Sequence, residues 1–152
     1  MRYFLWAAVT FFTFLIQGSI SIFDVTPNLT TVLACYAGIR KKERKGMFMG
    51  SLIGLVEDNI AGPFLGPNLL SKGFIGYFSS LVYSRFFVWT PVLGMISISV
   101  LTLADGFIVL MSRSIFDKMP VNFWAAAFIV LIQSLLNAPF GIFLKPKKEP
   151  GE

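Results

Sequence analysis

Histidine is absent from this sequence, and cysteine occurs once, at Cys35. Without histidine the chain cannot form a Ser-His-Asp triad, and zinc sites of the usual His/Cys type are excluded. A single cysteine excludes an internal disulfide, and the HExxH and GxSxG patterns of hydrolases are missing as well. We therefore expect no catalytic activity, no metal ion and no other cofactor.

Charged residues are also scarce. They make up 14% of the chain, whereas soluble domains carry roughly 25%. Hydrophobic residues make up 55%, and the mean hydropathy is +0.73. A surface built from this composition is poorly solvated by water, so we expect an all-α integral membrane protein. Its 152 residues are enough for about one domain.

Six apolar segments are expected to be transmembrane helices. They cover residues 3–23, 28–39, 46–60, 69–83, 86 or 88–111, and 122–144. Several are shorter than the ~20 residues that a full span needs. Residues 1–145 are thus expected to form a single six-helix transmembrane domain, followed by a disordered cytoplasmic tail at 146–152.

The first segment could instead be a signal peptide. Its basic region is only Met1 and Arg2, its apolar part is long, and no small-residue cleavage site follows. We therefore expect an uncleaved first span.

The placement of basic residues predicts the orientation. With both termini in the cytoplasm, ten of the 13 Lys and Arg residues lie on the cytoplasmic side, and Lys72, Arg113 and Lys118 lie outside. This is the positive-inside pattern, and it argues against nucleic acid as the reason for the net charge of +5. The basic run at 40–45 is expected to form a water-exposed tip that attracts anionic lipid or docks a cytoplasmic partner.

A glycine stripe begins the most distinctive stretch, at 46–77. Gly46, Gly50 and Gly54 recur every four residues, a small-xxx-small pattern that lets two helix backbones approach closely. Glu57 and Asp58 follow on the same packing face. Two interpretations stay open, namely a plain packing seam whose acids reach the headgroups, or a buried polar site.

Asp105 is a third candidate, because it lies well inside the fifth segment with apolar neighbours on both sides. The topology places it at a depth similar to that of Asp58. We expect either an ion pair or hydrogen-bond network with Lys72, Arg113 or Lys118, or separate access of each acid to water.

Glycine and proline punctuate the chain at two turns. Gly62 and Gly66, with prolines after each, predict a rigid turn, which suits either the broken helices of transporters or a tight hairpin. Pro27 is expected in the first turn of the second helix, beside Asn28.

These features together resemble the MreD family of rod shape-determining proteins. The resemblance rests on the order of three segments: Thr26-Pro27-Asn28-Leu29 with Tyr36, the spaced run Gly50, Gly54, Asp58, Gly62 and Gly66 with Leu70 and Tyr77, and Asp105. Glu57 and Asn59 stand where the family more often has aliphatic residues. Either Gln133 or Asn137 could correspond to the polar residue of the family's sixth helix.

The resemblance implies a non-enzymatic, multi-pass protein of the bacterial cytoplasmic (inner) membrane. It would act with MreC, and with MreB, a transpeptidase and the SEDS glycosyltransferase, to direct lateral peptidoglycan synthesis. The resemblance also implies a fold like that of the substrate-binding S component of energy-coupling-factor transporters. An S component of a vitamin transporter is the alternative function, although the first segment lacks the AxxxA surface that docks the transport engine.

Overall fold

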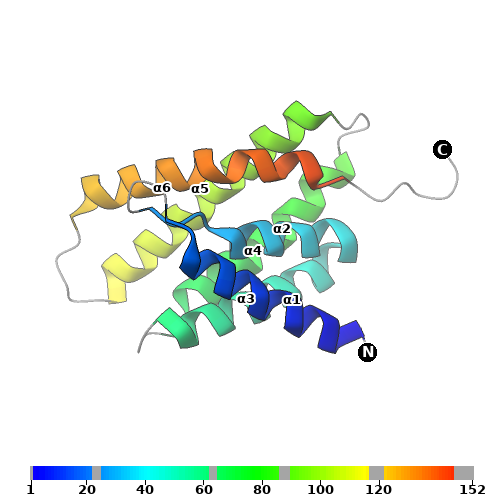
Figure 1. The fold of residues 1–152 in the computed structure, drawn as a ribbon, viewed down its shortest axis with the longest axis horizontal. Helices are drawn as coiled ribbons and strands as arrows, with labels where there is room; N and C mark the ends of the chain where they lie inside the picture. The colour runs from blue at the N-terminus through cyan, green and yellow to red at the C-terminus, as the bar shows by residue number, and fades with distance from the viewer. Residues whose placement is uncertain (1, 22–24, 62–64, 86–89, 117–121, 146–152) are drawn as a thin grey trace, which may run out of the picture.

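The chain is mainly helical in the computed structural model, which describes all residues except 1, 22–24, 62–64, 86–89, 117–121 and 146–152 (Figure 1). The elements are α1 (Arg2–Ser19), α2 (Leu29–Lys41), α3 (Glu43–Ala61), α4 (Pro67–Arg85), α5 (Pro91–Phe116), α6 (Phe123–Asn137) and the 3₁₀ helix η1 (Ala138–Phe143). The predicted all-α class with six helices is thereby confirmed. Two stretches, Pro91–Phe116 and Phe123–Phe143, are long and apolar enough to cross a membrane.

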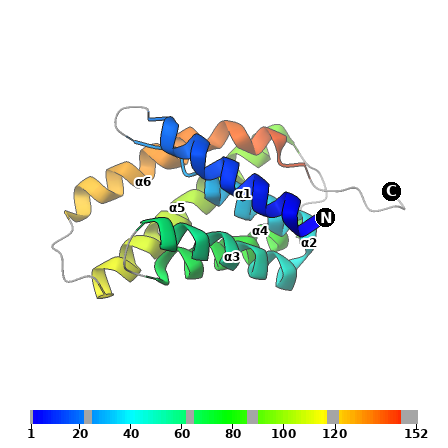
Figure 2. The same cartoon turned by 60° about the horizontal axis from the view of Figure 1, so that its bottom comes forward.

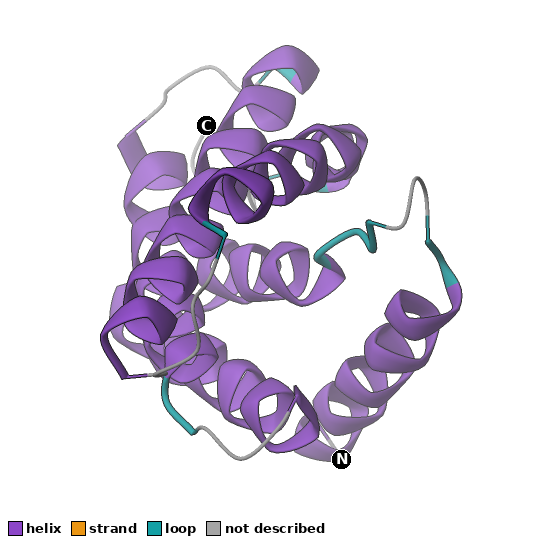
Figure 3. Ribbon diagram, turned by 90° about the vertical axis from the view of Figure 1, so that its left-hand side faces the viewer, coloured by secondary structure: helices purple, strands orange, loops and turns teal. Residues whose placement is uncertain are grey.

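One part of the bundle consists of α2, α3 and α4, which pack against one another. On one side α5 packs against α4 and η1, and α6 packs along α5. Figure 2 shows this arrangement from below, with α3 and α4 side by side. By contrast, α1 lies at the edge of the bundle, as Figure 3 shows, and meets it mainly through α2.

The glycine stripe of α3 explains the close approach of α3 to α4. A Cβ atom added to Gly50 would overlap the backbone carbonyl of Lys72, and one added to Gly54 would overlap the carbonyl of Asn68. A Cβ on Gly46 would come within 2.7 Å of the Gly76 carbonyl. The stripe is therefore a packing seam, as the small-residue pattern predicts, and its partner is a helix of the same chain.

The basic run at 40–45 forms the exposed connection between α2 and α3, in line with the predicted water-exposed tip. Arg40 and Lys41 form the last turn of α2, and α3 begins at Glu43. Lys42 alone connects the two helices and takes a left-handed backbone conformation, with φ of 67°. Lys and Arg are good helix formers, so they continue both helices up to this connection.

Two helix boundaries near prolines, the start of α2 and the end of α6, differ from the sequence prediction. Pro27 precedes α2 instead of lying in its first turn, because the Asn28 side chain accepts from the backbone N–H of Thr31 and caps the helix. The sixth helix was expected to continue unbroken to Leu144. It changes to 3₁₀ geometry at Ala138, next to Pro139, whose ring cannot donate the hydrogen bond of a regular α-helix.

Candidate functional site

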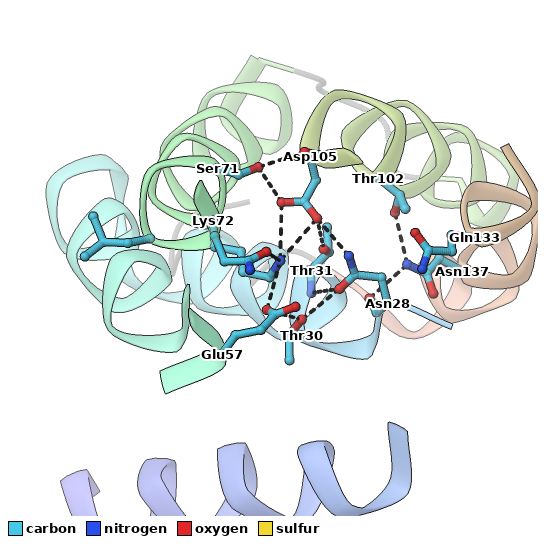
Figure 4. A network of polar contacts seen from close by, with 12 residues as sticks. Asn28, Thr30, Thr31, Glu57, Ser71, Lys72, Thr102, Asp105, Gln133 and Asn137 are labelled. Carbon is cyan, nitrogen blue, oxygen red and sulfur yellow. Dashed lines mark hydrogen bonds and ion pairs between the residues drawn. The ribbon is translucent and has the colours of Figure 1, made fainter. Parts of the chain in front are cut away.

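A fully buried lysine lies at the centre of the bundle. The ammonium of Lys72, on α4, is 2.9 Å from Oε2 of Glu57 and 3.3 Å from Oδ2 of Asp105 (Figure 4). It also donates to Oδ1 of Asn68 at 3.2 Å. An ammonium has three hydrogens, and these three partner groups account for all of them.

The Asp105 carboxylate is the most heavily bonded member of this network, and the side chain is completely buried. It accepts from the Thr31 hydroxyl at 2.6 Å and from Nδ2 of Asn28 at 2.9 Å, both near the start of α2. Ser71 of α4 donates to its other oxygen. Asp105 thus joins α5 to α2 and α4, and each of its oxygens has charged or polar donors as buried carboxylates require.

Glu57 is the member of the network nearest to the surface, with 14% of its side chain exposed. Besides the ion pair with Lys72, its Oε2 lies 2.8 Å from the Thr30 hydroxyl. The same hydroxyl is 2.7 Å from Oδ1 of Asn28. A hydroxyl has one hydrogen, so Thr30 donates to one of these two acceptors at a time, and the network has two alternative arrangements at this position.

Asp58 belongs to the same network through a different partner. Its carboxylate accepts from the backbone N–H groups of Gly66 (2.9 Å), Asn68 (3.1 Å) and Leu69 (3.0 Å) at the start of α4. It therefore satisfies N–H groups that a helix start leaves unpaired, where negative charge is also favoured by the helix dipole. The Asn68 side chain donates to Asp58 at 2.9 Å and accepts from Lys72, which links the cap to the buried lysine.

Two amides of the sixth helix hold the segment that leads into α2. Nδ2 of Asn137 donates to the backbone carbonyl of Asn28 at 2.9 Å and to the Thr102 hydroxyl at 3.1 Å. Gln133 donates to the carbonyl of Thr26 at 3.1 Å. Both side chains therefore fix the position of Asn28, which in turn bonds to Asp105.

The polar contacts of this site connect helices to one another. Three acids and one lysine are held by fixed partners, and a lysine nucleophile would need a free, deprotonated amine. Across the part of the chain that the structure describes, no group of three or more His, Cys, Asp or Glu side chains is arranged to hold a metal ion. The network fixes α2, α3, α4 and α5 relative to one another.

The acids and cations that the sequence offered as candidates meet only in part as expected. Of the three cations considered, Lys72 forms the ion pairs, Arg113 is exposed near the end of α5, and Lys118 lies outside the described residues, as do Gly62 and Pro63. Asp58 and Asp105 do not touch one another directly but are joined through Asn68 and Lys72.

Sequence reasoning missed Asn68 and Ser71 as members of the network. The signal was present, because Asn68 and Lys72 are four residues apart and so share a face of α4. The polar side chains of an otherwise apolar helix marked this face, but their partners are far away in the sequence.

In a comparison with known protein families, residues 1–146 match the family described as rod shape-determining protein MreD. No curated protein and no solved structure matches the chain.

Proposed function

The chain belongs to the MreD family of rod shape-determining proteins, and from this premise we propose that it is a non-enzymatic membrane subunit of the bacterial cell-elongation complex. It acts with MreC to direct lateral peptidoglycan synthesis and so maintains cell shape. MreB, a transpeptidase and the SEDS glycosyltransferase are further partners in this proposal. The observation that carries it is the family match, which extends over nearly the whole chain.

The proposed location is the cytoplasmic membrane, with several spans and both termini in the cytoplasm. The distribution of side chains supports this location, because Asp58, Lys72 and Asp105 lie inside the bundle and many large apolar side chains lie outside. Lys72 and Asp105 are fully buried, whereas Phe11, Phe128 and Leu135 are each more than 60% exposed. Such a surface suits lipid, and the excess of Lys and Arg at the proposed cytoplasmic ends supports the proposed orientation.

The proposed mechanism is that of a rigid scaffold. The buried ion pairs and hydrogen bonds fix four helices, so the outer apolar faces keep a constant shape toward the membrane span of MreC. The buried charged groups Asp58, Lys72 and Asp105 all have close partners, and buried polar networks favour one arrangement of a bundle when their members are satisfied. The short helices α2 and η1 also support an S-component-like arrangement, which we propose for the fold.

Glu57 is the proposed point at which the network meets a partner. Of the three candidate acids, Glu57 is partly exposed, whereas Asp58 and Asp105 are buried. A polar group from MreC could replace the Thr30 hydroxyl on Glu57, since that hydroxyl has Asn28 as a second acceptor. Asp58 and Asp105 would then contribute by holding the helices that position Glu57.

Complementation tests this function directly. The chain is expressed with MreC from the same source in a rod-shaped bacterium depleted of its own MreD-family protein. Rod shape should return, and MreC should copurify with the chain from detergent extracts. Asp105→Asn should weaken both effects, and Arg113→Ala, at an exposed position, should not.

Two results would contradict the proposal. One is a chain that reaches the membrane in normal amount but restores neither rod shape nor copurification of MreC. The other is restored vitamin uptake in a host that lacks its S component, which would favour the transporter alternative.

A further inference from the structure

An apolar groove of about 300 Å³ lies between α1, α2 and η1. The residues lining it come from all three elements and the turn after η1: Thr13, Ile16, Leu29, Val32, Leu33, Tyr36, Phe140, Phe143 and Leu144. We call it the α1–α2–η1 groove. It belongs to neither the Lys72 network nor the glycine seam.

The groove offers water almost nothing to bind. Its polar lining groups are Thr13 and Tyr36, and the Thr13 hydroxyl donates to the carbonyl of Val9 at 2.8 Å. Apolar cavities without polar partners do not hold ordered water. An apolar occupant is therefore favoured.

The dimensions favour a narrow occupant. An α-helix with its side chains is ~10 Å wide, and roughly one turn of it or less would fill the available volume. A single acyl chain is much thinner and can lie along the groove. The wall formed by α1 is only loosely attached to the bundle, through α2 and a hydrogen bond of 3.3 Å from the Thr30 backbone N–H to Gln17.

One end of the groove carries positive charge. The guanidinium of Arg40 lies over the ring of Tyr36, 5.2 Å from its centre, and the Trp6 ring lies 6.0 Å from that of Tyr36. Lys145 follows the groove residue Leu144 directly and is exposed. The apolar lining thus ends in an aromatic pair and two cations. This arrangement is complementary to an amphipathic ligand with an anionic head.

We propose that this groove binds an anionic phospholipid of the cytoplasmic leaflet, with one acyl chain between α1 and α2 and the phosphate at Arg40 and Lys145. The inference rests on the membrane location and orientation proposed above, which place this end of the groove at the cytoplasmic surface. The bound lipid fills the space beside α1 and connects that helix to the bundle.

The test measures lipid binding to the full-length chain, purified and delipidated in nonionic detergent. Phosphatidylglycerol and phosphatidylcholine with identical acyl chains are titrated separately and followed by native mass spectrometry. One phosphatidylglycerol should bind per chain, with a preference over phosphatidylcholine. Arg40→Gln should reduce its affinity about fivefold, the effect of one basic residue near an anionic lipid. Arg44→Gln, also at an exposed position but on α3, which does not line the groove, should have a much smaller effect.

A second variant tests the apolar part of the groove. Val32→Trp fills it and should reduce binding of both lipids, whereas Val92→Trp on the exposed face of α5 should not. Because Arg40 is exposed, its substitution should leave the fold intact even if Val32→Trp disturbs it.

Equal binding of the two lipids, or unchanged binding in Arg40→Gln, would overturn the proposal. So would crosslinking of MreC from a photoreactive residue at Thr13, because a protein segment would then occupy the groove. Failed complementation with intact lipid preference would count against the proposed function alone. Lost preference with intact complementation would count against the groove alone.

Discussion

At the residue scale, Lys72 is the side chain on which the charge balance of the buried network depends. Removing a charge from water costs several kcal/mol, and the cost is recovered only when the partners are close and every hydrogen is bonded. Glu57, Asp105 and Asn68 together meet this requirement. Loss of the lysine would leave two acids facing one another without a cation.

Lys72→Met should therefore lower the free energy of unfolding by about 3–5 kcal/mol, the usual effect of breaking a buried ion pair. The measurement is unfolding by SDS in mixed micelles, followed by tryptophan fluorescence. The triple variant with Glu57→Gln and Asp105→Asn should be less destabilised than Lys72→Met alone, because no unpaired charge remains. A triple variant that is less stable than the single variant would show that the charges are not the source of the effect.

Asp58 illustrates a second type of residue effect, in which one side chain satisfies the start of a helix. Asp58→Ala leaves three backbone N–H groups at the beginning of α4 without their acceptor. The expected loss is about 2–3 kcal/mol, combining a lost cap with buried unpaired donors. Asn59→Ala is the matched control at the neighbouring exposed position, and it should change stability by less than about 0.5 kcal/mol in the same assay.

At the scale of the elements, the pairing of α3 with α4 depends on the absence of side chains. Gly50→Ala places a methyl group against the Lys72 carbonyl, and because this is backbone, the helices must separate. We expect a loss of about 1–3 kcal/mol, as for other overpacked cores. Gly18→Ala is the control, since a Cβ there meets nothing within 4 Å. Equal stability of the two variants in SDS unfolding would contradict the close packing of α3 and α4.

The amides of the sixth helix act at the same scale. Gln133 and Asn137 were hard to assign from the sequence because both are polar residues in an apolar run. The structure assigns each to a backbone carbonyl of the segment before α2. They explain how a short helix with an irregular start holds a fixed place in the bundle.

At the scale of the whole molecule, the orientation can be tested by cysteine labelling in intact cells. Lys42→Cys, between α2 and α3, should react only with a membrane-permeant maleimide. Ser114→Cys, exposed near the end of α5, should also react with an impermeant one. Cys35 is fully buried, so the parental chain supplies the unlabelled control. The reverse pattern at the two positions would contradict the proposed topology.

The sequence by itself determined the helical class, the number of helices, the glycine seam and the family resemblance. These follow from local properties, because hydropathy, the four-residue spacing of Gly46, Gly50 and Gly54, and the order of segments can be read along one dimension. It also identified Glu57, Asp58 and Asp105 as unusual, since a charge in an apolar run stands out without any partner being known.

Only the tertiary structure decided which partners these acids have. Asp58 caps α4, whereas Asp105 reaches Asn28 and Thr31, more than 70 residues away in the sequence. The sequence offered Lys72 as one of three cations, and helix packing made it the buried one. Contacts between distant segments depend on crossing geometry and side-chain direction, which residue spacing within one helix does not specify.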